Sequence, residues 1–364
     1  MKNLVQSLMQ EQPTQWDTTL ENDYKIKIVR DGDVASLKYD QLESPMGEPI
    51  VQQCRGMVVN VTRRQALAWP YNKFWNHGEA LAATIDWATA RVQEKLDGSL
   101  MILHWRDDEW TVASSGHPSA GGSFGADTRT FREAFWSIMN AHGIDVQALD
   151  RETTYMLELC DAPNRVVVNH EKPRLVLHGA RTLESGEELT ASELALKAMG
   201  AGLELVRSFP ISTASDALAA AETLDPIQQE GFVVVDGAFN RVKIKSSRYV
   251  ILHHMKGEAT PRRAIELWQT GETGELLAHF PEMAPVILSI HERLDEVARR
   301  AAAEHDEAMC RGCNRKGYAS MATRYPFSAV MFRMLTDGST GVEAAKGIMR
   351  RMSLAALEWL VDIA

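Results

Sequence analysis

The run Lys95-Leu96-Asp97-Gly98-Ser99 combines residue types that could support covalent chemistry on phosphorus. A lysine that attacks phosphorus must be unprotonated or easily deprotonated, and nearby cations favour that state. Gly98 would let the chain turn tightly into a strand beginning at Ser99, so that backbone could approach a nucleotide closely. A run with three such fixed residues also occurs by chance in roughly one chain in twenty of this length, and an exposed turn is then the alternative.

Two carboxylates lie within or beside apolar segments further along the chain. Glu158 is the one acid in the apolar run 155–160, and Glu230 immediately precedes the apolar run 231–235. A carboxylate on an apolar strand is costly unless it is paired or binds a cation. A salt-bridged core glutamate is the alternative for Glu158, with about one chance in three. Both residues are therefore candidates for charge chemistry.

Three cations alternate with apolar residues near residue 243. Strand periodicity places Arg241, Lys243 and Lys245 on one face and Val242 and Ile244 on the other. Neighbouring cations repel each other unless an anion lies among them, and a triphosphate would serve as that anion. The alternative is the solvated outer face of a hairpin.

The segment from residue 55 to about residue 250 must position these side chains, and its pattern predicts mainly short strands. Asp107-Asp108 and Asp236-Gly237 are expected to form hairpin turns. Two helices interrupt the strands, one over about 127–141 and one that begins at Thr190, where Glu193 would complete a capping box. The expected strands are Arg55–Val61, Ser99–Trp105, Glu109–Ser115, Thr154–Cys160, Asn164–His170, Arg174–Arg181, Gly231–Asp236 and Arg241–Ser246.

The strand pattern stops after about Met255, and the rest of the chain has helical spacing. Pro285–Met309 and Val342–Ile363 carry apolar residues three and four positions apart. Arg315-Lys316 is expected in a loop near Gly317. We therefore predict two domains, residues 1–255 and 256–364.

The composition is that of an ordinary globular protein. The 364 residues are 45% hydrophobic and carry a net charge of −10, which argues against a protein that coats nucleic acid by bulk electrostatics but not against a local basic groove. The sequence contains no run of 18 apolar residues and no signal-peptide pattern, so a cytoplasmic location is expected. Cys310 and Cys313, with His305, could form a zinc site, with about one chance in ten.

The parts described above, taken in order, resemble the RNA ligase 1 family, the bacteriophage tRNA-repair ligases. The resemblance extends from about residue 50 to at least residue 335. The segments that carry it are Cys54–Met57, Asn72–Asn76, Lys95–Ser99, Glu158–Val168, Glu230–Val233, Lys243–Lys245 and Arg315–Ala319.

The resemblance implies an α+β fold, with an antiparallel-sheet covalent nucleotidyltransferase core followed by an all-α domain that influences the choice of RNA. It implies an ATP-dependent RNA ligase. Lys95 would take AMP from ATP as a lysyl-AMP intermediate, the AMP would pass to an RNA 5′-phosphate, and a 3′-hydroxyl would displace it. Implied catalytic residues are Lys95, Asp97, Lys243 and Lys245.

The family pattern also implies the cofactors and partners. Mg²⁺, with Mn²⁺ as a substitute, would lie near Glu158 and Glu230. The partners would be ATP and RNA, either nicked tRNA or single-stranded ends. The location would be the host cytoplasm if a phage encodes the protein. No membrane or obligate protein partner is indicated. The implied ATP-binding residues are Arg55, Lys73, Lys95, Gly98, Glu158, Glu230, Lys243 and Lys245.

Two departures from the family pattern are visible. Ser115 stands where the family typically has a lysine, and Arg248 where an aromatic residue is expected. A loose match also relates the acidic residues Glu272 and Glu275 to a metal-binding pair of the family.

Two other functions are alternatives to an RNA ligase. One is a DNA ligase or mRNA guanylyltransferase, which usually carries a small β-barrel after the last lysine motif. The other is a non-catalytic RNA-binding module. The helical C-terminal pattern and the complete set of motifs argue against them.

Overall fold

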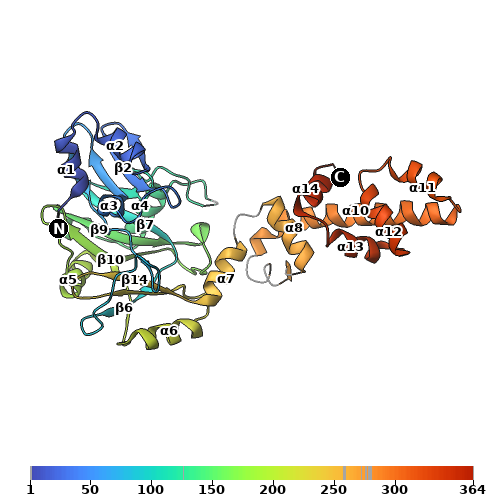
Figure 1. Ribbon diagram of the computed structural model, residues 1–364. Helices are drawn as coiled ribbons and strands as arrows, with labels where there is room; N and C mark the ends of the chain where they lie inside the picture. The colour runs from blue at the N-terminus through green and yellow to red at the C-terminus, as the bar shows by residue number, and fades with distance from the viewer. Residues whose placement is uncertain are drawn as a thin grey trace. The chain divides into compact units, whose positions relative to one another are not determined.

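Two units make up the chain, and three β-sheets form most of the first. The computed structural model describes residues 2–125, 127–256, 260–271, 273–274, 277 and 281–363, with only the backbone for residues 251, 253–256, 282 and 363. The first unit is Met1–Ile251 and the second is Leu252–Ala364 (Figure 1). Helix α7 (Ser247–Lys256) crosses this division, so the expected boundary after residue 255 falls at the end of that helix. Glu272 and Glu275 lie outside the described residues.

The first sheet is antiparallel, in the order β1-β2-β3-β4. One face packs against three N-terminal helices through residues such as Val5, Met9 and Leu37, and the other packs against the second sheet through Val58 and Ile102. The sequence pattern did not indicate β1, β2 or these helices. The elements are α1 (Leu4–Glu11), α2 (Trp16–Asn22), β1 (Ile26–Asp31), β2 (Val34–Tyr39), α3 (Pro49–Gln53), β3 (Arg55–Asn60) and β4 (Gln65–Ala68).

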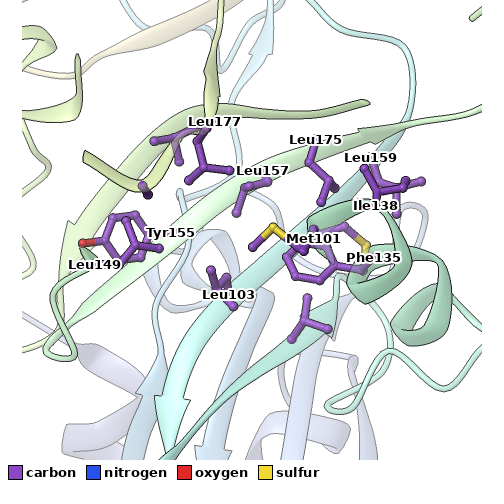
Figure 2. Packing of buried hydrophobic residues seen from close by; sticks show 14 of the residues in the cluster. Met101, Leu103, Phe135, Ile138, Leu149, Tyr155, Leu157, Leu159, Leu175 and Leu177 are labelled. Carbon is purple, nitrogen blue, oxygen red and sulfur yellow. The ribbon is translucent and has the colours of Figure 1, made fainter. Parts of the chain in front are cut away.

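The second sheet has the order β11-β10-β9-β7-β8 and is antiparallel except between β10 and β11. Helices α4 and α5 cover one face; Figure 2 shows Phe135 and Ile138 of α4 among Met101, Leu159 and Leu175 of the sheet. These helices therefore bury one face of the strand that carries Glu158. The elements are β7 (Ser99–Arg106), β8 (Glu109–Ser114), α4 (Phe131–Ala141), η1 (Val146–Ala148), β9 (Thr153–Cys160), η2 (Ala162–Asn164), β10 (Arg174–Thr182), α5 (Ala191–Ala201) and β11 (Glu204–Leu205).

The third sheet has the order β12-β6-β13-β14-β5, and only β14 and β5 run parallel. Val242 and Ile244 pack with Ala217 and Ala221 of α6, so the alternating cations of β14 lie on the opposite face, as predicted. The elements are β5 (Trp75–Asn76), β6 (Arg91–Lys95), β12 (Ser208–Phe209), α6 (Ala214–Thr223), β13 (Gly231–Val235) and β14 (Arg241–Lys245).

The described part of the second unit is helical. Helix α10 buries Ile287, Ile290, Leu294 and Val297 at three- and four-residue spacing. None of the helices in the described ranges is long and apolar enough to span a membrane. The elements are α8 (Pro261–Thr270), η3 (Pro281–Met283), α10 (Ala284–Cys310), α11 (Arg315–Ala322), α12 (Ser328–Asp337), α13 (Val342–Met349) and α14 (Leu354–Ile363).

The predicted α+β fold is confirmed, with antiparallel sheets preceding helices. Seven of the expected strands match β3, β7, β8, β9, β10, β13 and β14 within two residues at each end, and Thr190 caps α5 through a capping box with Glu193. The predicted strand Asn164–His170 is wrong. The helical pattern expected over 342–363 corresponds to two helices, α13 and α14. The Arg315-Lys316 pair begins α11 instead of lying in a loop, because Asn314 caps that helix.

Candidate active site

Lys95 ends β6 beside the glutamate that precedes β13. The pairing of three strands places Lys95, Gly231 and Lys245 directly opposite one another. The carboxylate of Glu230, the residue before Gly231, reaches both lysines, with its oxygens 2.6 Å from Lys95 Nζ and 2.9 Å from Lys245 Nζ. Glu230 is buried, and its charge offsets the repulsion between the two ammonium groups. The structure thus brings three of the predicted site residues together.

Gly98 lies in the turn between β6 and β7, against the backbone of β9. A Cβ atom at this position would lie 2.3 Å from the Leu159 carbonyl oxygen and 3.1 Å from Cγ of Glu158. Glycine is therefore required by close packing. Its absence of a side chain allows the lysine turn to approach the strand that carries Glu158.

Asp97 is buried, and its carboxylate stabilises the loop at residues 164–170, which lies beside the β6–β7 turn that follows Lys95. It accepts hydrogen bonds of 2.7 Å from the backbone N–H groups of Val167 and Val168, and one of 2.9 Å from the Tyr249 hydroxyl. His170 Nε2 lies 2.6 Å from the Asp97 carbonyl oxygen. In this structure Asp97 therefore positions the elements around Lys95, and the catalytic role that the resemblance implies for it stays a prediction.

These hydrogen bonds explain why residues 164–170 do not form the predicted strand. Two of their N–H groups bond to the Asp97 carboxylate and so cannot join a strand ladder. The Asn164 side chain donates a hydrogen bond of 2.7 Å to Ser99 Oγ. The segment is a loop fastened to the lysine turn at several points.

A cavity of about 260 Å³ lies next to Lys95. Its wall combines the apolar side chains of Phe74, Leu100 and Val233 with charged groups from all three sheets. Such a mixture suits a planar base with a charged tail. The predicted residues in its lining are Arg55, Lys95, Gly98, Glu158 and Lys243.

Glu158 lies on the cavity wall, where burial raises the pKa of its carboxyl to about 7 in spite of the Lys95 charge. Its Oε2 is 3.6 Å from Nε2 of His178 on β10. Burial and the Arg55 charge lower the pKa of His178 to about 3, so this histidine is neutral and the pair is no ion pair at neutral pH. The carboxyl of Glu158 therefore retains capacity to interact with a ligand.

Three further predicted cations surround the same space. Arg55 and Lys243 approach the Phe74 ring, at 5.2 and 4.9 Å from its centroid. Lys73 lines an adjacent cavity of about 270 Å³ that shares Phe74 and Arg241 with the first. Burial, then Lys73 and the other neighbouring cations, lower the pKa of Lys243 to about 7. Among the described residues, none of Arg55, Lys73 and Lys243 has a carboxylate within 4.0 Å, so this region carries uncompensated positive charge.

The structure adds Tyr71 and Tyr249, which the sequence did not single out, and Glu188, which pairs with Arg241. Tyr71 donates a hydrogen bond of 2.7 Å to the His178 carbonyl, and Arg241 lies 4.0 Å from the Tyr71 ring centroid and pairs with buried Glu188. The period-two pattern had already placed Arg241 on the correct face. Tyr249 supplies an aromatic ring one position after Arg248, 5.5 Å from Lys245 Nζ.

No three His, Cys, Asp or Glu side chains gather as a metal-binding cluster in the portion of the chain that the structure describes. His305 lies 2.6 Å from the Tyr318 hydroxyl, and Cys310 and Cys313 are exposed and free. Mg²⁺ commonly takes one or two protein carboxylates and completes its coordination with phosphate oxygens and water. Glu158, on the cavity wall, is a candidate for one such carboxylate, whereas both oxygens of Glu230 contact lysines, Lys95 and Lys245.

Antiparallel sheets hold Lys95 beside Glu230 on the wall of a cationic cavity, the arrangement expected of a ligase-type nucleotidyltransferase. The sequence model of the RNA ligase family matches residues 53–249, more than half of the chain. The chain belongs to this family.

Two relatives support the same assignment. A protein of Autographa californica nuclear polyhedrosis virus, provisionally named as a bifunctional polynucleotide kinase/RNA ligase, is 27% identical over 284 residues, which are 72% of this chain and 40% of the viral protein. An RNA ligase of Rhodothermus phage RM378 is 23% identical over 314 residues, or 70% of this chain and 71% of the phage protein. The chain thus spans less than half of the viral relative.

Solved structures of an RNA ligase of Naegleria gruberi also align with the chain. A variant with ATP and Mn gives a TM-score of 0.38 at 18% identity, and a complex with pyrophosphate gives 0.37 at 19% identity. Each alignment covers 46% of this chain and 52% of the other. These scores lie below the level at which a shared fold is inferred from superposition.

Proposed function

We propose that the protein is an ATP-dependent RNA ligase that joins RNA 5′-phosphate and 3′-hydroxyl ends through a lysyl-AMP intermediate. The observation that carries the proposal is the position of Lys95, which lines the cavity and contacts Glu230 at 2.6 Å. Family membership supports the same chemistry. The natural substrate would be a broken RNA such as a nicked tRNA or a pair of single-stranded ends.

In the first step the Lys95 nitrogen would attack the α-phosphorus of ATP. A P–N bond forms, the bond from that phosphorus to the bridging oxygen breaks, and pyrophosphate leaves. Lys95 must lose a proton, and the Glu230 carboxylate is its hydrogen-bonded neighbour. Arg55, Lys73 and Lys243 would bind the phosphates, because their charges lack carboxylate partners among the described residues.

A divalent cation at Glu158 and Glu230 would neutralise phosphate charge when bound. Mg²⁺ is the proposed ion, and Mn²⁺ would substitute for it. The second and third steps transfer AMP to the RNA 5′-phosphate and then release it as the 3′-hydroxyl attacks. Both steps would use the same cationic surroundings.

The test is incubation with α-labelled ATP and Mg²⁺, followed by denaturing electrophoresis. We expect a covalent, acid-labile and base-stable protein–AMP adduct, absent in Lys95→Ala and retained in Lys197→Ala as a matched control on α5. Labelling of the Lys95→Ala protein would refute the assignment of the nucleophile. Labelling with GTP but not ATP would indicate a guanylyltransferase instead.

A further inference from the structure

A row of three cations crosses the N-terminal sheet toward the cavity. Lys27 on β1, Lys38 on β2 and Arg55 on β3 occupy directly opposed positions. Like charges at opposed positions on neighbouring strands repel each other. Arg55, at the inner end of the row, lines the cavity that contains Lys95.

A β-bulge places Arg55 beside Lys38. Pairing of β2 with β3 shifts by one residue between Leu37, which faces Met57, and Lys38, which faces Arg55. The extra residue is Gly56, at φ 88°, where a Cβ atom would lie 2.8 Å from the Ser115 Cα. Without the bulge, Lys38 would face Gly56, so the irregularity brings the two cations together beside Ser115, the residue that follows β8.

Only the outermost of these cations has an acidic partner among the described residues. Lys27 lies 2.7 Å from Asp40, whereas the half-buried Lys38 has Ser115 Oγ at 3.4 Å and no carboxylate within 4.0 Å. Burial, together with Lys27 and Arg55, lowers the pKa of Lys38. The Nη1 atom of Arg55 is buried without a hydrogen-bond partner. Two adjacent cations thus lack the anion that would balance them.

We propose that Lys38, together with Arg55 and Ser115, binds the terminal phosphates of the nucleotide and the pyrophosphate that leaves. This inference rests on the proposed function. The α-phosphorus must lie at Lys95, and Arg55 borders the same cavity while Lys38 extends the row beyond it. The Lys38 ammonium and the Ser115 hydroxyl supply hydrogen-bond donors for phosphate oxygens, and the anion relieves the repulsion along the row.

The experiment compares Lys38→Met, which keeps most of the side-chain stem, with Lys38→Arg and with Lys27→Met as the matched control. We expect Lys38→Met to raise the KM for ATP in adenylylation about tenfold or more, which is the effect of one charge-assisted hydrogen bond. The pyrophosphate concentration that gives half-maximal reversal of lysyl-AMP formation should rise by the same factor. Lys38→Arg should restore most of the affinity. Lys27→Met should match wild type, because Asp40 already partners that lysine.

Two further measurements identify the phosphate. Joining of pre-adenylylated RNA needs no triphosphate, so Lys38→Met should leave it unchanged; a loss confined to this reaction would show that Lys38 contacts RNA and would overturn the proposal. Calorimetric binding of pyrophosphate with Mg²⁺ to Lys95→Ala protein should weaken when Lys38→Met is added, and equal affinity would also overturn it. If the wild-type protein forms no AMP adduct, the proposed function fails. The calorimetric affinity for pyrophosphate still tests the role of Lys38, because that measurement does not require adduct formation.

Discussion

Glu230 holds two lysines that would otherwise repel each other across β13. Replacing it with glutamine removes the negative charge and keeps the size, so Lys95 and Lys245 would lose their carboxylate partner. We expect Glu230→Gln to slow adenylylation about 100-fold or more, the usual cost of removing a charge-stabilising group from such a site. We expect Glu158→Gln to slow it similarly, because the carboxyl lies on the cavity wall.

The measurement for both variants is the single-turnover rate of adduct formation, with circular dichroism to verify the fold. Glu109→Gln, an exposed change at the start of β8, is the matched control. A near-wild-type rate in either variant would assign that glutamate a purely structural role.

Lys243 should make the stability of the ligand-free protein depend on pH. Its pKa is near 7 in the fold, below its usual 10.5, because it is buried among Lys73, Arg55, Lys95 and Lys245. Well below pH 7 the lysine is protonated in both the folded and the unfolded state, and the full cost of the buried charge is present. Between pH 7 and 10.5 the folded state releases the proton first, so the cost decreases as pH rises.

Lys243→Met should therefore raise the melting temperature most at or below pH 7, by about 2–4 °C for each kcal/mol gained, and less at pH 9. Thermal unfolding of both proteins at pH 6, 7 and 9 measures this difference. ATP binding by the variant should weaken at the same time. A gain that is equal at all three pH values would contradict the pKa assignment.

At the scale of the element, the turn between β6 and β7 depends on its contact with β9. Gly98→Ala would place a methyl group 2.3 Å from the Leu159 carbonyl oxygen, and backbone cannot move aside as a flexible side chain can. Overpacking of this kind typically costs about 1–3 kcal/mol. We expect a lower melting temperature and loss of adenylylation, because Lys95 is carried on the displaced turn.

Gly47→Ala is the matched control for this substitution, since no atom lies within 4 Å of the added Cβ. Melting curves and adduct yields of the two alanine variants should separate clearly. Equal behaviour would mean that the β6–β7 turn tolerates a wider separation from β9 than the structure indicates.

At the scale of the whole molecule, we propose a division of labour between the two units. Every residue assigned to the nucleotide site lies at or before Tyr249, within Met1–Ile251. The net charge of −10 argues against attraction of RNA by bulk electrostatics but not against a local basic surface. We therefore propose that the second unit influences which RNA is joined, and that the exposed Arg315 and Lys316 at the start of α11 contact phosphates.

A protein truncated after Lys256 should still form the lysyl-AMP adduct with ATP at a rate close to that of the full chain. Its preference for a nicked anticodon loop over a generic single strand should change. The two measurements are adduct formation and the ratio of joining rates on the two RNAs. Loss of adenylylation in a folded truncation, or an unchanged ratio, would contradict the division.

The sequence by itself indicated candidate residues for the chemistry and determined which faces of their strand the cations near residue 243 occupy. Strand periodicity placed Lys243 and Lys245 opposite Val242 and Ile244, and the order of motifs led to the RNA ligase family. These inferences succeed because the two-residue period of a strand and the hydrogen bonds of a capping box are local. Nothing local identified β1, β2 or the helices that cover them.

Tertiary structure decided the contacts between segments. The Lys95–Glu230 bond joins residues 135 apart in the chain, and it forms only in the register that places Gly231 between two lysines. The sequence of residues 164–170 predicts a strand because its side chains favour one. The segment is a loop because the backbone N–H groups of Val167 and Val168 donate hydrogen bonds to the Asp97 carboxylate. The row from Lys38 to Arg55 exists only through a bulge at Gly56. Such long-range pairings depend on register and packing, which short-range sequence patterns do not specify.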